Sequence, residues 1–108
     1  MNFIEDMYKR TNKFPKEEMF GLTTQLRKAS ISIALNIAEG SGAGSDVKFN
    51  RFLNIALRSS YEVVCGIEIA RILRYLNEFE SQKLLEGCEE LSAMMGGLKR
   101  NLKLNNRF

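Results

Sequence analysis

The sequence contains no histidine. Histidine is the commonest general acid or base near neutral pH, and it activates serine and cysteine nucleophiles. Its absence excludes Ser-His and Cys-His pairs, and it excludes the Glu-x-x-His motif that holds two metal ions in ferritin-like bundles. We therefore expect no enzymatic activity, no cofactor and no small-molecule substrate.

Proline and cysteine are scarce. Pro15 is the only proline in 108 residues, so little interrupts a helix between that point and the C-terminus. The two cysteines, Cys65 and Cys88, fall on different predicted helices. Because no secretory signal accompanies them, we expect two buried thiols and no disulfide.

Long apolar runs are also missing. A run such as 63–67, with its glycine counted, is about five residues long, whereas a membrane span needs about 20. Residues 1–6 lack the basic segment followed by an apolar stretch that marks a signal peptide. These features predict a cytoplasmic protein with no membrane partner.

What the sequence does contain is helical periodicity. Its length suits a single domain, 1–108, and 44% hydrophobic with 27% charged residues is typical of a folded chain. Apolar residues recur every three or four positions, which predicts helices at 2–12, 15–40, 46–76 and 78–104. Short connections make neighbouring helices antiparallel. We therefore predict an all-α, up-down-up-down four-helix bundle with a short first helix.

Three local signals set the predicted helix ends. Pro15 disfavours helix at the residue before it and suits the first turn of the second helix. Ser45 can cap the third helix. Asn77 and Glu80 have the spacing of a capping box, which would open the fourth.

The second and third helices have more apolar positions than one buried face requires. Two stripes follow the second helix: Met19, Leu22, Leu26, Ala29, Ile33 and Asn36, and beside them Phe20, Ile31, Leu35 and Ala38. The third helix is apolar nearly all round, which is typical of a helix buried on all sides. The short first helix would also leave Phe49, Phe52 and Leu98 short of cover. A chain this small can supply that cover only with further copies, so we expect a homo-oligomer.

Three segments carry a family resemblance: Phe14-Pro15-Lys16-Glu17-Glu18, Asn36-Ile37-Ala38-Glu39-Gly40, and Arg51-Phe52-Leu53-Asn54-Ile55-Ala56-Leu57. In this order they resemble the family called "four helix bundle protein", encoded in intervening sequences of bacterial 23S ribosomal RNA genes. The resemblance implies an antiparallel four-helix bundle and a ring of five subunits, without a known activity. Related bundles are accessory proteins of diversity-generating retroelements, which implies by analogy a nucleic-acid role.

Glu39 lies inside the second segment, and Glu62 follows the third, where Tyr61-Glu62 also matches the family. They are either a carboxylate pair near a site or, as we favour, interface groups paired with Arg27, Arg51 or Arg58. Asn36 on the inner stripe is expected to fix helix register or to bond a neighbouring backbone. The glycine-rich segment 40–45 follows a helix and lacks the Gly-Lys-Ser/Thr ending of a phosphate loop, so it is predicted to be a turn.

The charge distribution suggests a candidate site, although the net charge is only +3. The predicted topology brings the start of the third helix and the end of the fourth to one end of the bundle. The cations there are Lys48, Arg51, Lys99, Arg100, Lys103 and Arg107, against two acids, Glu39 and Asp46.

Helix dipoles account for cations at the end of the fourth helix but not for Lys48 and Arg51 near the start of the third. The cluster therefore predicts binding to the phosphate backbone of RNA or DNA with little sequence preference. A smaller basic group, Lys9, Arg10, Lys13 and Lys16, is diluted by acids at the other end. Two hypotheses remain open: a homo-oligomeric scaffold or interaction module, and a nucleic-acid-binding accessory protein.

Overall fold

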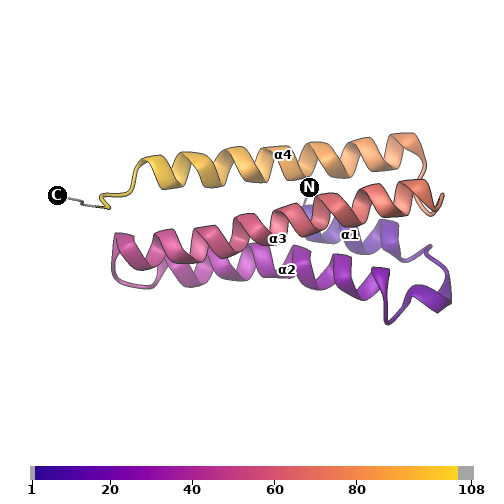
Figure 1. Cartoon of the computed structure of the whole chain (residues 1–108), viewed down its shortest axis with the longest axis horizontal. Helices are drawn as coiled ribbons and strands as arrows, with labels where there is room; N and C mark the ends of the chain where they lie inside the picture. The colour runs from indigo at the N-terminus through magenta and orange to yellow at the C-terminus, as the bar shows by residue number, and fades with distance from the viewer. Residues whose placement is uncertain (1, 105–108) are drawn as a thin grey trace.

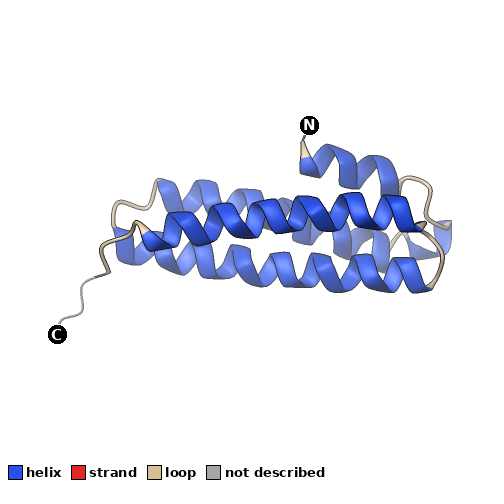
Figure 2. Cartoon of the chain, turned by 90° about the horizontal axis from the view of Figure 1, so that it is seen from above, coloured by secondary structure: helices blue, strands red, loops and turns tan. Residues whose placement is uncertain are grey.

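The computed structural model describes residues 2–104 and consists of four α-helices and one short 3-10 helix. The elements are α1 (Phe3–Thr11), η1 (Lys16–Glu18), α2 (Leu22–Ser41), α3 (Asp46–Ile72) and α4 (Glu78–Arg100). In Figure 1, α2 runs along the bundle, α3 returns beside it and α4 reverses again. Figure 2 shows no strand in the part of the chain that is described. The predicted all-α bundle with a short first helix is confirmed.

The bundle is elongated, with extents of 51 × 24 × 24 Å, and its four helices form a roughly square cross-section. α1 packs against α2 and α4, and α3 packs against the same two helices, so α1 and α3 occupy opposite corners. α1 has 9 residues against 20 in α2, and it lies along only one half of the bundle. An open groove of about 450 Å³ lies between α2 and α4 next to the first residues of α1. It is lined by Ile33, Ile37, Leu91 and Met94.

The predicted caps of α3 and α4 are present. The Ser45 hydroxyl accepts a hydrogen bond from the Lys48 N–H at 3.2 Å. At the start of α4, Asn77 Oδ1 accepts from the Glu80 N–H at 2.8 Å, and Glu80 Oε1 accepts from the Asn77 N–H at 3.0 Å. This capping box satisfies two N–H groups that the helix itself leaves without partners.

Glu80 also contacts two cations, Arg10 in the last turn of α1 and Lys13 just after that helix. The hydrogen bond from the Asn77 backbone, followed by the one from Lys13, lowers the pKa of the Glu80 carboxyl below its ordinary value. The carboxylate thus fastens the start of α4 to the end of α1 in its charged form.

The second helix does not begin at Pro15 as predicted. Residues 16–18 form a 3-10 turn, and α2 starts at Leu22, after Gly21 adopts non-helical angles (φ −118°, ψ −112°). The Glu18 carboxylate accepts from the Leu22 N–H at 3.2 Å and from the Tyr75 hydroxyl at 2.9 Å, which holds this turn against the end of α3. Met19 and Phe20, assigned to apolar stripes from their spacing, therefore lie in an exposed turn.

The third helix ends at Ile72, four residues earlier than predicted, because the backbone turns left-handed at Arg74 (φ 67°). The Tyr75 N–H donates to the Ala70 carbonyl at 2.8 Å, and the Arg74 N–H donates to the Arg71 carbonyl at 3.0 Å. These two bonds are those of a Schellman C-cap, in which glycine normally takes the left-handed position. The fourth helix likewise ends at Arg100, not at residue 104.

All four helices contribute to one apolar core. Its fully buried members include Met7, Leu26, Leu53, Ile67 and Leu84. The inner stripe predicted for α2 is confirmed at Leu26, Ala29 and Ile33, whereas Leu35 of the second stripe is exposed. Phe49, Phe52 and Leu98 are half-buried.

α2 and α3 approach closely because small residues lie between them. A Cβ atom added to Gly66 would lie 2.6 Å from Leu26, and one added to Gly40 would lie 2.8 Å from Phe52. Midway, the Ser59 hydroxyl donates to the Ser32 hydroxyl at 2.9 Å. Asn36 donates to the Ser32 carbonyl at 2.8 Å, within its own helix. The two glycine contacts and the Ser32–Ser59 bond fix the register of α2 on α3.

Replacing Arg74 with glycine is expected to stabilise the protein by about 1 kcal/mol, since glycine adopts the left-handed conformation without a steric cost. Urea unfolding would measure the gain. Arg74→Ala removes the guanidinium but keeps the unfavourable backbone, so it should show no such gain. Equal stabilisation by both substitutions would contradict the explanation.

Glu80→Gln keeps the capping hydrogen bonds but removes the charge. Because the pKa of Glu80 is lowered by folding, the charged form stabilises the protein above the ordinary carboxyl pKa of 4.5, and this is lost as pH falls through the folded pKa. We expect Glu80→Gln to cost up to about 1 kcal/mol at pH 7 and almost nothing well below that value. Glu80→Ala should cost about 1 kcal/mol more at either pH, because the cap is also lost. A pH-independent Gln effect would contradict the assignment.

Candidate functional site

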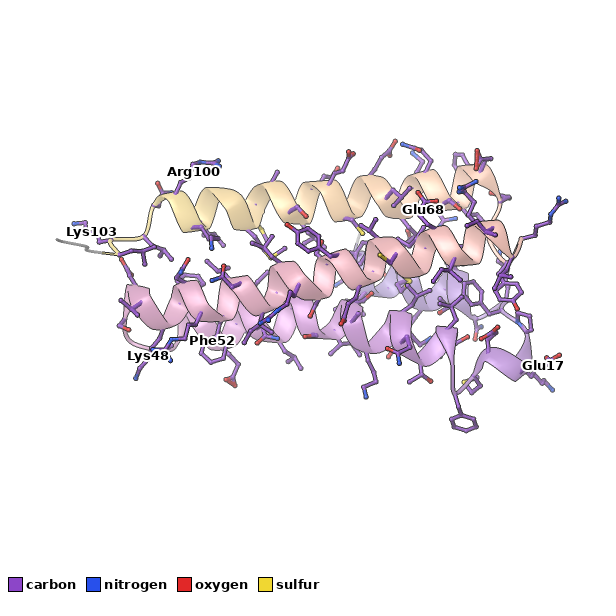
Figure 3. All side chains as sticks on the ribbon, viewed as in Figure 1. Glu17, Lys48, Phe52, Glu68, Arg100 and Lys103 are labelled. Carbon is purple, nitrogen blue, oxygen red and sulfur yellow. The ribbon has the colours of Figure 1, made fainter. Side chains whose placement is uncertain are left out.

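The predicted basic residues lie at the end of the bundle that carries the α2–α3 loop. Figure 3 shows Lys48, Arg100 and Lys103 at this end, with Lys48 pointing to one side of the bundle and Arg100 to the opposite side. Arg51 is one helical turn beyond Lys48, and Lys99 precedes Arg100 on α4. Arg107 lies outside the described residues. The cations therefore surround this end instead of forming one flat patch.

Two polar contacts organise the basic end. The Lys99 ammonium donates to the Asn54 side chain and so connects α4 to α3. Asp46 accepts from the Lys103 backbone N–H at 2.8 Å, which ties the segment after α4 to the start of α3. None of Lys48, Arg51, Lys99, Arg100 and Lys103 takes part in an ion pair within residues 2–104.

The opposite end contrasts with this one. There, Arg10 pairs with Asp6 at 2.9 Å, and Arg10 and Lys13 both contact Glu80. Arg71 pairs with Glu68 at 2.8 Å and with Glu78 at 3.7 Å. Within residues 2–104, Lys9, Lys16 and Arg74 are the cations at that end without an ion-pair partner, against five at the basic end.

Glu39 and Glu62 do not form a carboxylate pair. Gly40 packs on Phe52, which places Glu39 near that level of α3, and Glu62 is ten residues, about 15 Å, farther along the helix. Both side chains are exposed, and neither is in an ion pair within residues 2–104. This separation argues against one shared site.

Arg27, considered above as a partner for these acids, is engaged elsewhere. Its Nε donates to the Thr11 hydroxyl at 2.9 Å, and its guanidinium lies 4.5 Å from the centre of the Tyr8 ring. Arg27 therefore fastens α1 to α2. Arg58 and Glu62 line an open groove of about 510 Å³ between α2 and α3, together with Gln25, Tyr61 and Cys65.

The expectation of two buried thiols is wrong for Cys65, which is exposed on the outer face of α3. Cys88 is buried, and burial, followed by the charge of Glu89, raises the pKa of its thiol to about 11. A thiol with so high a pKa is almost entirely protonated at neutral pH and is a poor nucleophile.

Within residues 2–104, no group of three or more Cys, Asp and Glu side chains is arranged to hold a metal ion. No helix there is both long enough and apolar enough to cross a membrane.

The outer face of α3 is the surface that sequence reasoning located least well. It carries exposed apolar side chains along the whole helix: Val47, Ile55, Tyr61, Ile69, Ile72 and Leu73. The apolar excess of this helix was evident from the sequence, but which residues would remain uncovered was not. Their periodicity was the available signal, since Ile55, Ile69 and Ile72 are separated by 14 and 3 residues, which keeps them on one side of the helix.

The comparison with known proteins bears on the chain as a whole. A model of the 23S rRNA-intervening sequence protein family matches residues 1–97. No curated protein matches this chain. The match covers most of the four-helix fold described above, including the segments around Asn36 and Phe52 that carry the resemblance. This chain belongs to the 23S rRNA-intervening sequence protein family.

Proposed function

We propose that the protein is a non-enzymatic, homo-oligomeric scaffold or interaction module. The observation that supports this most directly is the exposed apolar face of α3. Ile72 is 67% exposed, Tyr61 63% and Val47 50% in the single chain. Single exposed apolar residues are normal on a protein surface, but several that recur along one face of a helix, here between charged residues such as Arg51 and Glu62, are typical of an interface.

The core does not need these residues. α3 already buries Leu53, Val63 and Ile67 completely against its own neighbours. The outer row lies on the side away from that core, and α2 adds Leu35 at 58% exposure. A second copy is the cover proposed for both surfaces. The family resemblance implies five copies, and a ring of that kind requires each copy to present two different faces.

A second function, binding to nucleic-acid backbone, is supported by the contrast between the two ends. Lys48, Arg51, Lys99, Arg100 and Lys103 have no ion-pair partner within residues 2–104, whereas Arg10, Lys13 and Arg71 have acidic partners. Cyclic symmetry would repeat the basic end around one rim, where weak contacts from several subunits act together. Lysine and arginine bind phosphates irrespective of base sequence, so RNA and DNA are both possible ligands.

The oligomer hypothesis predicts that micromolar protein has a multiple of the 12.3 kDa chain mass in light scattering. Ile69→Glu should shift this mass toward the monomer, because it places a charge in the apolar row. Ala93→Glu, which adds the same charge on the exposed face of α4, should leave the mass unchanged. A monomeric wild-type protein would refute the proposed function.

The nucleic-acid hypothesis predicts binding to RNA or DNA at low salt. If three or four phosphates are neutralised, the logarithm of the association constant should fall against that of salt with a slope of about −2 to −4. Reversing Lys99, Arg100 and Lys103 to glutamate should abolish binding while circular dichroism stays helical.

The matched control reverses Lys9, Lys16 and Arg74, three exposed cations at the other end, and should bind almost as well as the wild type. Binding that survives the first triple substitution and not the second would move the site to that end. If no nucleic acid binds at low salt, the nucleic-acid function is refuted and only the scaffold role remains.

A further inference from the structure

The register between α2 and α3 provides a scale of height along the bundle. Leu26 contacts Gly66, Ser32 contacts Ser59, and Gly40 packs on Phe52. In each of these contacts the two residue numbers add to 91 or 92. Any position on α2 can therefore be assigned the α3 residue that lies at the same level.

Each of the two helices has an outward-facing row with one apolar and two charged residues. On α2 the row is Lys28, Leu35 and Glu39, and on α3 it is Arg51, Ile55 and Glu62. Their separations of seven, four, four and seven residues keep each row on one side of its helix. All six side chains are exposed, and none of the four charged ones is in an ion pair within residues 2–104.

The two rows match at every level. The residue numbers of Lys28 and Glu62, of Leu35 and Ile55, and of Glu39 and Arg51 all add to 90. Each pair is thus level to within one or two residues, about 1.5–3 Å along the axis. Opposite charges stand at the two outer levels and apolar side chains at the middle one.

Neither row makes the contact between its own two helices, because α2 and α3 pack through Leu26, Ser32 and Gly66. The α3 row lies beside that contact, where Glu62 lines the open groove between the two helices. A rotation about an axis parallel to the bundle keeps every residue at its height. In a second copy generated by such a rotation, the α3 row can face the α2 row of the first with all three levels aligned.

We propose that the α2 row of one copy packs on the α3 row of the next, an inference that rests on the proposed homo-oligomer. Lys28 pairs with the partner subunit's Glu62, Glu39 pairs with the partner subunit's Arg51, and Leu35 packs on the partner subunit's Ile55. The contact repeats the antiparallel α2–α3 packing found within the chain. It joins two different faces, which is the kind of contact that a ring of copies requires. Glu39 and Glu62 act in it as register-setting interface groups.

A charge exchange tests the pairing. Lys28→Glu and Glu62→Lys should each weaken association of the subunits about tenfold or more, because each brings like charges together at the interface. The double substitution should restore the wild-type mass, since opposite charges again face each other. Glu90→Lys, on the exposed face of α4, serves as the control and should have no effect. Unaffected single variants, or a double variant that stays dissociated, would overturn the proposal.

Cysteine cross-linking tests the geometry directly. In a Cys65→Ser background, Leu35→Cys combined with Ile55→Cys should give a ladder of disulfide-linked multimers after mild oxidation, since bonding requires Cα atoms about 5.5 Å apart. Either substitution alone should give no ladder, because each cysteine faces the other position in the next copy.

The outcomes separate this inference from the proposed function. A wild-type oligomer without a ladder, or equal cross-linking by a single variant, would refute the pairing of rows and leave the oligomer intact. A monomeric wild type would refute both.

Discussion

The close packing of α2 on α3 is the contact on which the rest of the structure depends. Gly66 and Gly40 let the helices approach, and the Ser32–Ser59 hydrogen bond sets their register. α1 packs against α2, and α4 packs against α3. A shift of α3 along α2 would therefore displace the whole core. The same register decides which outward-facing residues share a level, so it governs the proposed contact between copies as well as the fold.

The two ends of the bundle differ in how they treat charge. At one end, Glu80 gathers Lys13 and Arg10 while capping α4, so its carboxylate serves three partners in a small space. At the other, cations flank a glycine-rich turn and Asp46 is occupied by a backbone N–H. Charges at the first end hold helices together, whereas Lys48, Arg100 and Lys103 at the second form no ion pair within residues 2–104.

α3 has more apolar residues than the core of a single chain can bury, and the proposed assembly accounts for the rest. A bundle of this length has a narrow core, and α3 contributes Leu53, Val63 and Ile67 to it on one side. The apolar residues on its other side add nothing to the stability of a single chain and expose surface to water. Burial of these residues between copies would remove the apolar surface from water and so stabilise the assembly. Because α1 covers only part of the bundle, a single chain also buries less of its own surface.

The sequence by itself determined the class of fold, its helices and two of its caps, because helical periodicity and the Asn77–Glu80 spacing are local properties. It also located the basic residues on the ends of α3 and α4. Tertiary contacts decided the rest. Glu18 turned the segment after Pro15 into a 3-10 turn by bonding Tyr75 and Leu22, and a left-handed Arg74 ended α3 without the usual glycine. Whether Cys65 is buried, which cations are paired and which residues share a level all depend on how helices are rotated and aligned, and that information resides in the packing of one helix on another.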